Sequence, residues 1–356
     1  RVMGLLAINF DERISDQASS TARPPSFEAY QEFDRGWEIF LRSAGDDRAK
    51  SHFYRAFELD TTFVTPLRYA VLVNFNQGQN RGRWESWAEA DSLLRILERF
   101  EGRLSEYDKQ WLRYLKARVA GDNPEALRAT RRAAELAPGS RVVYNRAFVA
   151  NRVNRPQEAI DALLSLDPER GPMRGWFGYF EQLMRAYLVL DRHEKALEVA
   201  QRSRETFGDD ARGMGYEGLA LVGLGRIEEL NALLDDLVNQ PEEGLTQGYW
   251  IRVIAAFLRI HAHTGPARTT IGRAITWYEA RLPETKSRAE WHFDYALALY
   301  TANRCDDAYS VAKPLSDEFP EDLNYRGFVG LLAACRGDQD EALQVSQWLE
   351  ALDRPY

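Results

Sequence analysis

The feature of this 356-residue chain that most constrains its fold is a degenerate internal repeat of amphipathic helices. Each copy starts with a polar residue and a small Ala, continues as an apolar ridge and ends in a polar or proline-containing turn. The copies begin at Arg48-Ala49, Glu125-Ala126, Glu158-Ala159, Lys195-Ala196, Asp307-Ala308 and Glu341-Ala342. Alternating β-branched runs typical of strands are missing. Self-similarity at the period of one helix pair predicts an all-α solenoid, in which each pair packs only on its neighbours.

The small residues recur because they lie where neighbouring helices cross. Two antiparallel helices approach closely where one of them offers a small side chain and the other fills the space with a large one. The Ala residues serve this role in the second helix of each pair. Gly36, Gly218 and Gly330 are the residues expected to serve it in the first helix.

This arrangement resembles the tetratricopeptide repeat (TPR) family, most clearly in the second helices. The matching positions are Ala49, Phe53 and Ala56 in one copy, Ala126, Ala133 and Pro138 in another, and Ala308, Ala312 and Pro320 in a third. Segments 60–102 and 246–283 fit the pattern poorly. The resemblance covers Ser26 to Ala351 and implies a right-handed superhelical solenoid of about nine antiparallel helix pairs. We therefore assign residues 26–356 to a TPR-like array.

The N-terminal residues 1–25 are expected to form a short amphipathic helix and a linker that contains Pro24 and Pro25. Because the first residue is Arg rather than Met, we expect a processed chain or a fragment. Residues 1–10 and 23–30 resemble the junction that precedes the C-terminal TPR array of bacterial TolB-like regulators and Ser/Thr kinases. That resemblance implies a portion of a larger protein, and it favours a periplasmic or extracytoplasmic location over a cytoplasmic one.

Composition and motifs argue against several other functions. Lys and Arg number 46 against 54 Asp and Glu, a net charge of −8, which disfavours binding to nucleic acid. No apolar run approaches the ~18 residues of a membrane span. Gly213, Gly215 and Gly218 match the GxGxxG spacing, but a polar turn precedes them instead of a strand, so helix packing is the preferred interpretation.

The titratable residues show no arrangement typical of catalysis or metal binding. His261 and His263 are two residues apart on an expected helix, whereas a helical metal pair needs i, i+4 spacing. HExxH, CxxC, GxSxG and Walker A motifs are missing from the sequence. We therefore predict no catalytic residue, no metal site and no cofactor, and hence a protein that is not an enzyme.

The two cysteines, Cys305 and Cys335, leave two alternatives open. Each lies near the turn between the two helices of its own pair, and such turns follow one edge of a solenoid. They could form a disulfide that joins the last two pairs, or they could be two small buried packing residues. We prefer the second alternative because free cysteines are commonly buried.

Binding is expected on the face that the first helices line. The family's groove positions, transferred to this sequence, give ten candidates for partner binding: Arg141, Tyr144, Phe148 and Asn151 in the fourth pair, Glu181 and Arg185 in the fifth, Arg252 and Arg259 in the seventh, and Phe293 and Tyr300 in the eighth. Arginine with aromatic residues is a common interface mixture. The expected ligand is a protein or peptide with an acidic or C-terminal carboxylate group. The alternative is that each arginine only covers apolar surface or pairs with a neighbouring acid.

The sequence leaves three kinds of function open. The preferred one is a non-catalytic interaction module or scaffold. The second is a sensory or assembly segment of a larger bacterial regulator or complex, which predicts an exposed apolar end surface. The third is an α-helical toroid enzyme, which requires two carboxylates facing each other across a closed cavity.

Overall fold

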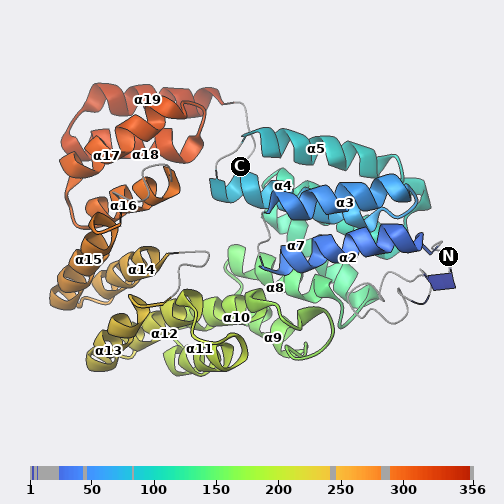
Figure 1. Ribbon diagram of the computed structural model, residues 1–356, viewed down its shortest axis with the longest axis horizontal. Coiled ribbons are helices and arrows are strands. Elements are labelled where there is room, and N and C mark those ends of the chain that lie inside the picture. Colours follow the sequence, from blue (N-terminus) through green and yellow to red (C-terminus); the bar gives the residue numbers. More distant parts are fainter. Residues whose placement is uncertain are drawn as a thin grey trace. The chain divides into compact units, whose positions relative to one another are not determined.

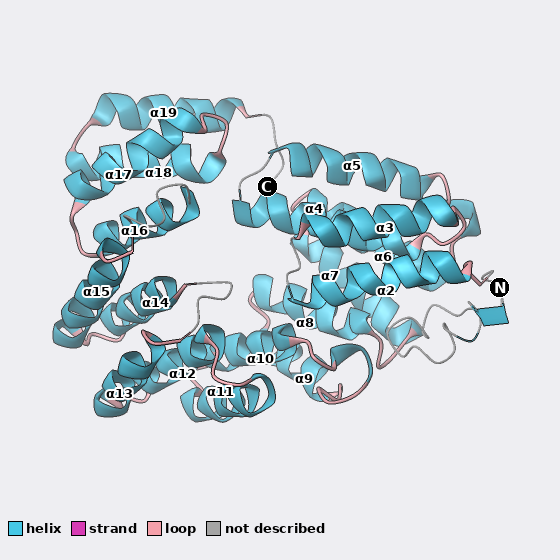
Figure 2. Ribbon diagram, viewed as in Figure 1, coloured by secondary structure: helices cyan, strands magenta, loops and turns pink. Residues whose placement is uncertain are grey.

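The computed structural model describes residues 2, 3, 6, 24–42, 46–81, 84–240, 246–281 and 289–352. These residues form eighteen α-helices and two short 3-10 turns, and none of them lies in a strand (Figure 2). The predicted all-α class is confirmed. The short helix and linker predicted for residues 1–25 fall almost entirely outside the described residues.

The helices follow one another as nine consecutive pairs (Figure 1). The pairs are α2 (Phe27–Arg42) with α3 (Asp47–Leu59), α4 (Thr65–Arg81) with α5 (Trp84–Glu98), α6 (Glu106–Val119) with α7 (Asn123–Leu136), α8 (Arg141–Arg152) with α9 (Pro156–Leu164), α10 (Phe177–Val189) with α11 (His193–Phe207), α12 (Ala211–Gly223) with α13 (Ile227–Leu237), α14 (Gln247–Ile260) with α15 (Thr264–Glu279), α16 (Ala289–Thr301) with α17 (Cys305–Glu318), and α18 (Leu323–Arg336) with α19 (Gln339–Ala351).

The chain divides into two compact units. Unit 1 comprises residues 1–186 together with the last two residues, and unit 2 comprises Tyr187–Arg354. Each unit is described by itself below. The single continuous array expected over residues 26–356 stays a prediction.

Side-chain caps start many of the helices. Ser105 accepts a hydrogen bond from the backbone N–H of Asp108, Asp122 accepts one from Glu125, and Asp210 accepts one from Gly213. Such caps satisfy N–H groups that the first helical turn leaves without a partner. These three helices therefore begin at positions that their own sequences specify.

The turn between the first and second helix has the same backbone form in the third to the ninth pair. In each of these seven turns one residue has a positive φ, and the values range from 53° to 83°: Gly121, Asn154, Asp191, Gly225, Ala262, Asn303 and Gly337. This left-handed conformation suits Gly and is tolerated by Asn and Asp. Ala262 is the unusual member of the series.

Close helix contacts depend on the glycines that the sequence singled out. A Cβ atom on Gly36 would lie 2.8 Å from the Phe53 ring, and one on Gly330 would lie 2.6 Å from Val345. Gly218 packs in the same way against Ile254, at 2.5 Å. The GxGxxG segment lies inside helix α12, so the packing interpretation is confirmed.

Candidate protein-interaction surface

The ten residues predicted for partner binding lie on four first helices. Six of them belong to α8 and α10 in unit 1, and four belong to α14 and α16 in unit 2. The two sets are therefore described separately.

Arg141 lies in the interior of unit 1, inside a cage of aromatic rings. Its side chain is only 4% exposed, and its guanidinium carbon lies 4.3 Å from the ring centre of Trp176 and 4.7 Å from that of Trp37. Tyr144 and Phe40 complete the cage, at 5.6 and 5.7 Å. Burial lowers the pKa of Arg141, and the ring faces offset part of that desolvation.

This cage removes two predicted residues from the surface. Tyr144 is only 8% exposed, and its ring packs edge-on against Trp176. Trp176 in turn stacks on Phe40 of α2, with the ring centres 5.9 Å apart. Arg141 and Tyr144, expected on the binding face, are thus covered by rings from α2 and from the segment before α10. Both residues stabilise the interior of unit 1.

A cluster of arginines around one phenylalanine lies on the neighbouring part of unit 1. The guanidinium of Arg118 (α6) lies 4.9 Å from the ring centre of Phe148, and that of Arg152 lies 5.1 Å from it. We call Arg118, Phe148, Arg152 and Arg185 the arginine stripe. Arg152 and Arg185 are exposed, Phe148 is half-buried and Arg118 is buried.

The charges of the stripe repel one another. Partial burial lowers the pKa of the Arg152 guanidinium, and the positive charges of Arg118 and Arg185 lower it further. Arg118 donates to Asn123 Oδ1 at 3.1 Å, and its buried Nε has no hydrogen-bond partner in the part of the chain that the structure describes. Neither Arg118 nor Arg152 forms an ion pair with an acidic side chain of the described residues. The stripe is therefore an electropositive surface that an anionic group would stabilise.

The remaining predicted residues of unit 1 border the stripe and are already bonded. Asn151 donates through Nδ2 to the backbone oxygen of Gln182 at 2.9 Å and to its Oε1 at 3.1 Å. Glu181 forms an ion pair with Arg185 at 3.0 Å. The sequence did not single out Arg118 and Arg152. The signal that could have found them is an Arg in the last turn of two successive first helices.

In unit 2, the aromatic candidates pack against the last pair. The ring of Phe293 lies 5.0 Å from that of Tyr325 and 5.4 Å from that of Phe328, and Tyr300 meets Phe328 at 5.8 Å. Phe293 and Tyr300 are half-buried. Their rings hold α16 against α18, and part of each side chain stays exposed to solvent.

The two arginine candidates of unit 2 contact an aromatic ring and a backbone carbonyl group. The Arg252 guanidinium lies 5.2 Å from the ring centre of Tyr249, and Arg259 donates to the backbone oxygen of Thr301 at 3.3 Å. Burial raises the pKa of Asp294 to about 6, and the positive charge of Arg252 opposes that rise. Asp294 is therefore an acid whose charge changes close to neutral pH.

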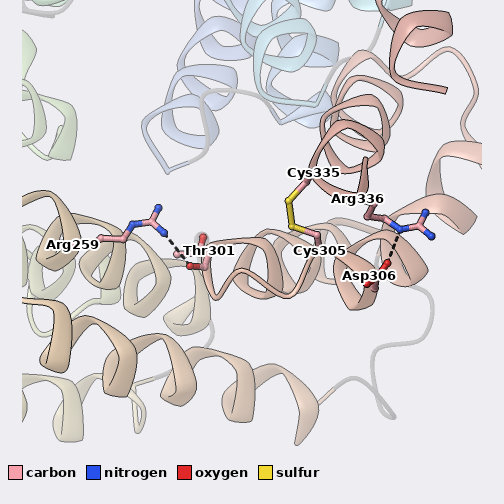
Figure 3. Close-up of a disulfide and its surroundings, with 6 residues drawn as sticks. All are labelled: Arg259, Thr301, Cys305, Asp306, Cys335 and Arg336. Atoms are coloured by element: carbon pink, nitrogen blue, oxygen red, sulfur yellow. Dashed lines mark hydrogen bonds and ion pairs between the residues drawn. A yellow bond between two sulfur atoms is a disulfide. The ribbon is translucent and has the colours of Figure 1, made fainter. Parts of the chain in front are cut away.

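The cysteines differ from our preferred prediction. Cys305 and Cys335 form a disulfide with a Cα–Cα distance of 6.1 Å, and Cys335 is exposed (Figure 3). The expectation of two buried packing residues was wrong, and the alternative of a bridge between the last two pairs is correct. The reason is positional: Cys305 starts α17 and Cys335 lies near the end of α18, so both side chains reach the same edge of the repeat. An ion pair between Arg336 and Asp306, at 2.7 Å, lies beside the bridge.

Two further properties of the described residues bear on function. No group of three or more His, Cys, Asp or Glu side chains in the described ranges could hold a metal ion. Among the described helices, none combines the length and the apolar character that crossing a bilayer requires.

Comparison with solved structures places this fold among TPR-like helical repeats. The chain is similar to Cut9 in the APC/C hetero-tetramer Cut9-Hcn1, with a TM-score of 0.50, 14% identity, and coverage of 90% of this chain and 58% of that one. A TPR protein from Parabacteroides merdae matches with a TM-score of 0.41 and 15% identity, over 69% of this chain and 93% of the other. A Rap protein in complex with competence and sporulation factor matches with a TM-score of 0.48 and 12% identity, over 90% of this chain and 99% of the other.

No known protein-family model matches the chain, and no curated protein sequence matches it either. The likeness is therefore one of fold. The chain has the all-α, TPR-like architecture of helix pairs that its sequence resembles.

Proposed function

We propose that this protein is a non-catalytic interaction module that binds an acidic peptide segment of a partner protein along the arginine stripe of unit 1. One observation carries the proposal: Arg118 and Arg152 both lie close to the ring of Phe148, and neither forms an ion pair with an acid of the described residues. An acidic ligand would supply the missing negative charge.

The chemistry of the stripe suits a carboxylate better than a neutral ligand. Guanidinium groups bind carboxylates through two parallel hydrogen bonds, and these charge-assisted bonds are stronger than neutral ones. The half-buried Phe148 offers an apolar surface next to these two cations. The structure of Cut9 with Hcn1 gives a precedent for a partner protein on this type of fold.

Binding of fluorescein-labelled acidic peptides, followed by anisotropy, tests the proposal. A pool of Glu- and Asp-rich peptides with free C-termini should bind, and the double variant R152A/R185A should weaken binding about tenfold or more, given the usual strength of hydrogen bonds to charged groups. R132A is the matched control, because Arg132 is an exposed arginine of α7 whose one ion pair among the described residues is with Glu135. Equal affinity of R152A/R185A and the wild-type protein would rule the stripe out.

The same peptides with amidated C-termini separate two kinds of carboxylate. Loss of affinity on amidation identifies a C-terminal carboxylate as the group recognised. Unchanged affinity identifies acidic side chains. Either result is compatible with the stripe as the site.

A second function, as an assembly segment of a larger complex, is favoured by the end of unit 2. Helix α19 buries only Val345, while Leu343 is 58% exposed. Terminal repeats of solenoids need a cap or a partner over their outer face. Light scattering of the wild-type protein and of L343E tests this function. If α19 is covered by a partner or by a second copy of the chain, the wild-type protein forms an assembly and L343E dissociates it.

A further inference from the structure

The two cysteines of the disulfide in unit 2 differ in their access to solvent. Cys335 is exposed, whereas Cys305 is half-buried. Cys335 lies one residue before the end of α18, and Cys305 is the first residue of α17 (Figure 3). A thiolate that attacks the bridge from solvent therefore reaches Cys335 more readily, because thiol–disulfide exchange requires access to the sulfur that is attacked.

The two sulfurs also differ in how well they carry a negative charge. Cys305 lies at the positive end of the α17 dipole, and the N-cap residue Arg304 makes no capping hydrogen bond through its side chain. A thiolate at such a helix N-terminus is stabilised by the dipole and by the N–H groups of the first turn. Cys335 lies in the last turn of α18, where the dipole disfavours an anion. Cys305 is therefore the better leaving group, since a more stable thiolate leaves faster.

The two acids next to Cys305 are paired with cations. Asp306 and Asp307 lie in the first turn of α17, where an unpaired carboxylate would repel a thiolate. Asp306 forms an ion pair with Arg336, and Asp307 forms one with Arg304, both at 2.7 Å. The arginines offset these two negative charges, so the helix N-terminus stays favourable for a thiolate.

We propose that Cys335 is a site of reversible modification by low-molecular-weight thiols, with Cys305 as the leaving group. The incoming thiolate forms an S–S bond to Sγ of Cys335 while the Cys305–Cys335 bond breaks. The electron pair of that bond remains on Sγ of Cys305, which becomes the thiolate. One disulfide replaces another, so the step consumes nothing besides the thiol. Attack of Cys305 on the mixed disulfide restores the bridge.

The modification loosens the last helix pair of unit 2. Without the bridge, α18 depends on noncovalent contacts such as those of the Phe328 ring with Phe293 and Tyr300. Helix α19 adds one buried side chain, that of Val345. A thiol on Cys335 therefore controls how firmly the last pair is held. This inference does not depend on the arginine stripe of unit 1.

The probe that tests the site is 2-mercaptoethanol, a small uncharged molecule. Native protein is incubated with it, N-ethylmaleimide stops the reaction, and mass spectrometry of a non-reduced digest locates both labels. We expect mercaptoethanol on Cys335 with maleimide on Cys305, at least about five times as often as the reverse arrangement. Equal or reversed labelling would overturn the proposal, and so would maleimide on both cysteines of protein that no thiol has treated.

Protein unfolded in urea with its bridge intact is the matched control. Unfolding removes both helices and exposes both sulfurs, so the two arrangements of labels should become about equally frequent. A preference for Cys335 that persists in urea would show that the neighbouring sequence directs the attack, and it would overturn the argument from the helix ends.

Two variants test the charge beside the leaving group. R336A removes the ion-pair partner of Asp306, so exchange with 2-mercaptoethanol should slow about twofold to fivefold. K313A is the control, because Lys313 lies about two turns further along α17 and pairs with Asp317. Circular dichroism confirms that both variants are folded. Equal exchange rates of R336A and K313A would overturn the stabilisation of the Cys305 thiolate.

Discussion

At the scale of single residues, the turn positions with positive φ show how the backbone limits the choice of side chain. Six of the seven turns carry Gly, Asn or Asp at that position, whereas Ala262 has a φ of 62°. An alanine in the left-handed region has its Cβ close to the following carbonyl oxygen. The seventh pair therefore carries this steric cost without the local side-chain hydrogen bonding by which Asn and Asp can offset it.

We expect A262G to stabilise unit 2 by about 1 kcal/mol, because Gly removes that steric contact. Urea denaturation followed by circular dichroism measures the change. G225A is the reverse substitution at an equivalent exposed turn with a φ of 68°, and it should destabilise by a similar amount. If A262G and G225A changed the free energy of unfolding in the same direction, this explanation would be contradicted.

Glycines inside helices divide into two kinds, and the structure predicts opposite effects for them. In G215A the new Cβ would lie 2.2 Å from the ring of Trp250, so this variant should lose about 1–3 kcal/mol. G272A adds the same methyl group in open space and should gain up to about 1 kcal/mol through helix propensity. Thermal denaturation of both variants distinguishes the effect of packing from that of helix propensity. Equal shifts of the melting temperature in G215A and G272A would refute the packing argument.

Asp294 gives unit 2 a dependence on pH. Burial raises its pKa to about 6 in the folded protein, from 3.8 when unperturbed, so the folded state binds the proton more tightly than the unfolded state. The free energy of unfolding therefore depends on whether Asp294 is protonated. The stability that the protonated carboxyl group contributes is fully present below about pH 4 and is lost as the pH rises through about 6.

The variant D294N should therefore be more stable than the wild-type protein at pH 7.5 by up to about 2–3 kcal/mol, and this advantage should shrink towards pH 4. Denaturation midpoints at pH 4.5, 6 and 7.5, values chosen to bracket the raised pKa, provide the measurement. An advantage that does not change with pH would show that Asp294 does not titrate as described.

At the scale of elements, the helix pairs were predictable because their determinants are local. Alanines such as Ala126 and Ala308 mark the second helices, and Gly218 and Gly330 lie where their own neighbours pack. The aromatic cage was not predictable in the same way. Trp37 and Trp176 are far apart in sequence, and only the folded unit brings them to Arg141.

The disulfide is the covalent link between the last two pairs, and it closes a loop with a sequence separation of 30. A loop of this size corresponds to about 3–4 kcal/mol of lost chain entropy in the unfolded state. We expect the double variant C305S/C335S to destabilise α17, α18 and α19, and hydrogen exchange should be faster there. Because the chain has only two cysteines, adding reductant to the wild-type protein should reproduce the effect, and adding it to the variant should do nothing.

At the scale of the whole molecule, a chain of helix pairs stabilises itself through contacts between neighbours. The composition and the repeat period were enough to predict the class and the number of pairs. They did not indicate the division into two units near residue 186, since no Pro- or Gly-rich segment marks it and α10 continues through it.

Removal of residues 321–356 tests how far such contacts extend. The truncated chain should keep the hydrogen-exchange protection of helices α2 to α9 in unit 1, because in a solenoid each pair is stabilised mainly by its neighbours along the sequence. It should also bind more of a hydrophobic dye, because Phe293 and Tyr300 lose their contacts with α18. Faster exchange throughout unit 1 would instead show cooperativity along the whole chain.

The exposure of Cys335 has a consequence for cell biology. A sulfur–sulfur bond that solvent can reach equilibrates with the thiol buffer of its surroundings, so it opens in a reducing compartment and persists in an oxidising one. Alkylation of protein taken directly from its native cells, followed by mass analysis of the two cysteines, would therefore record the redox environment in which the chain resides.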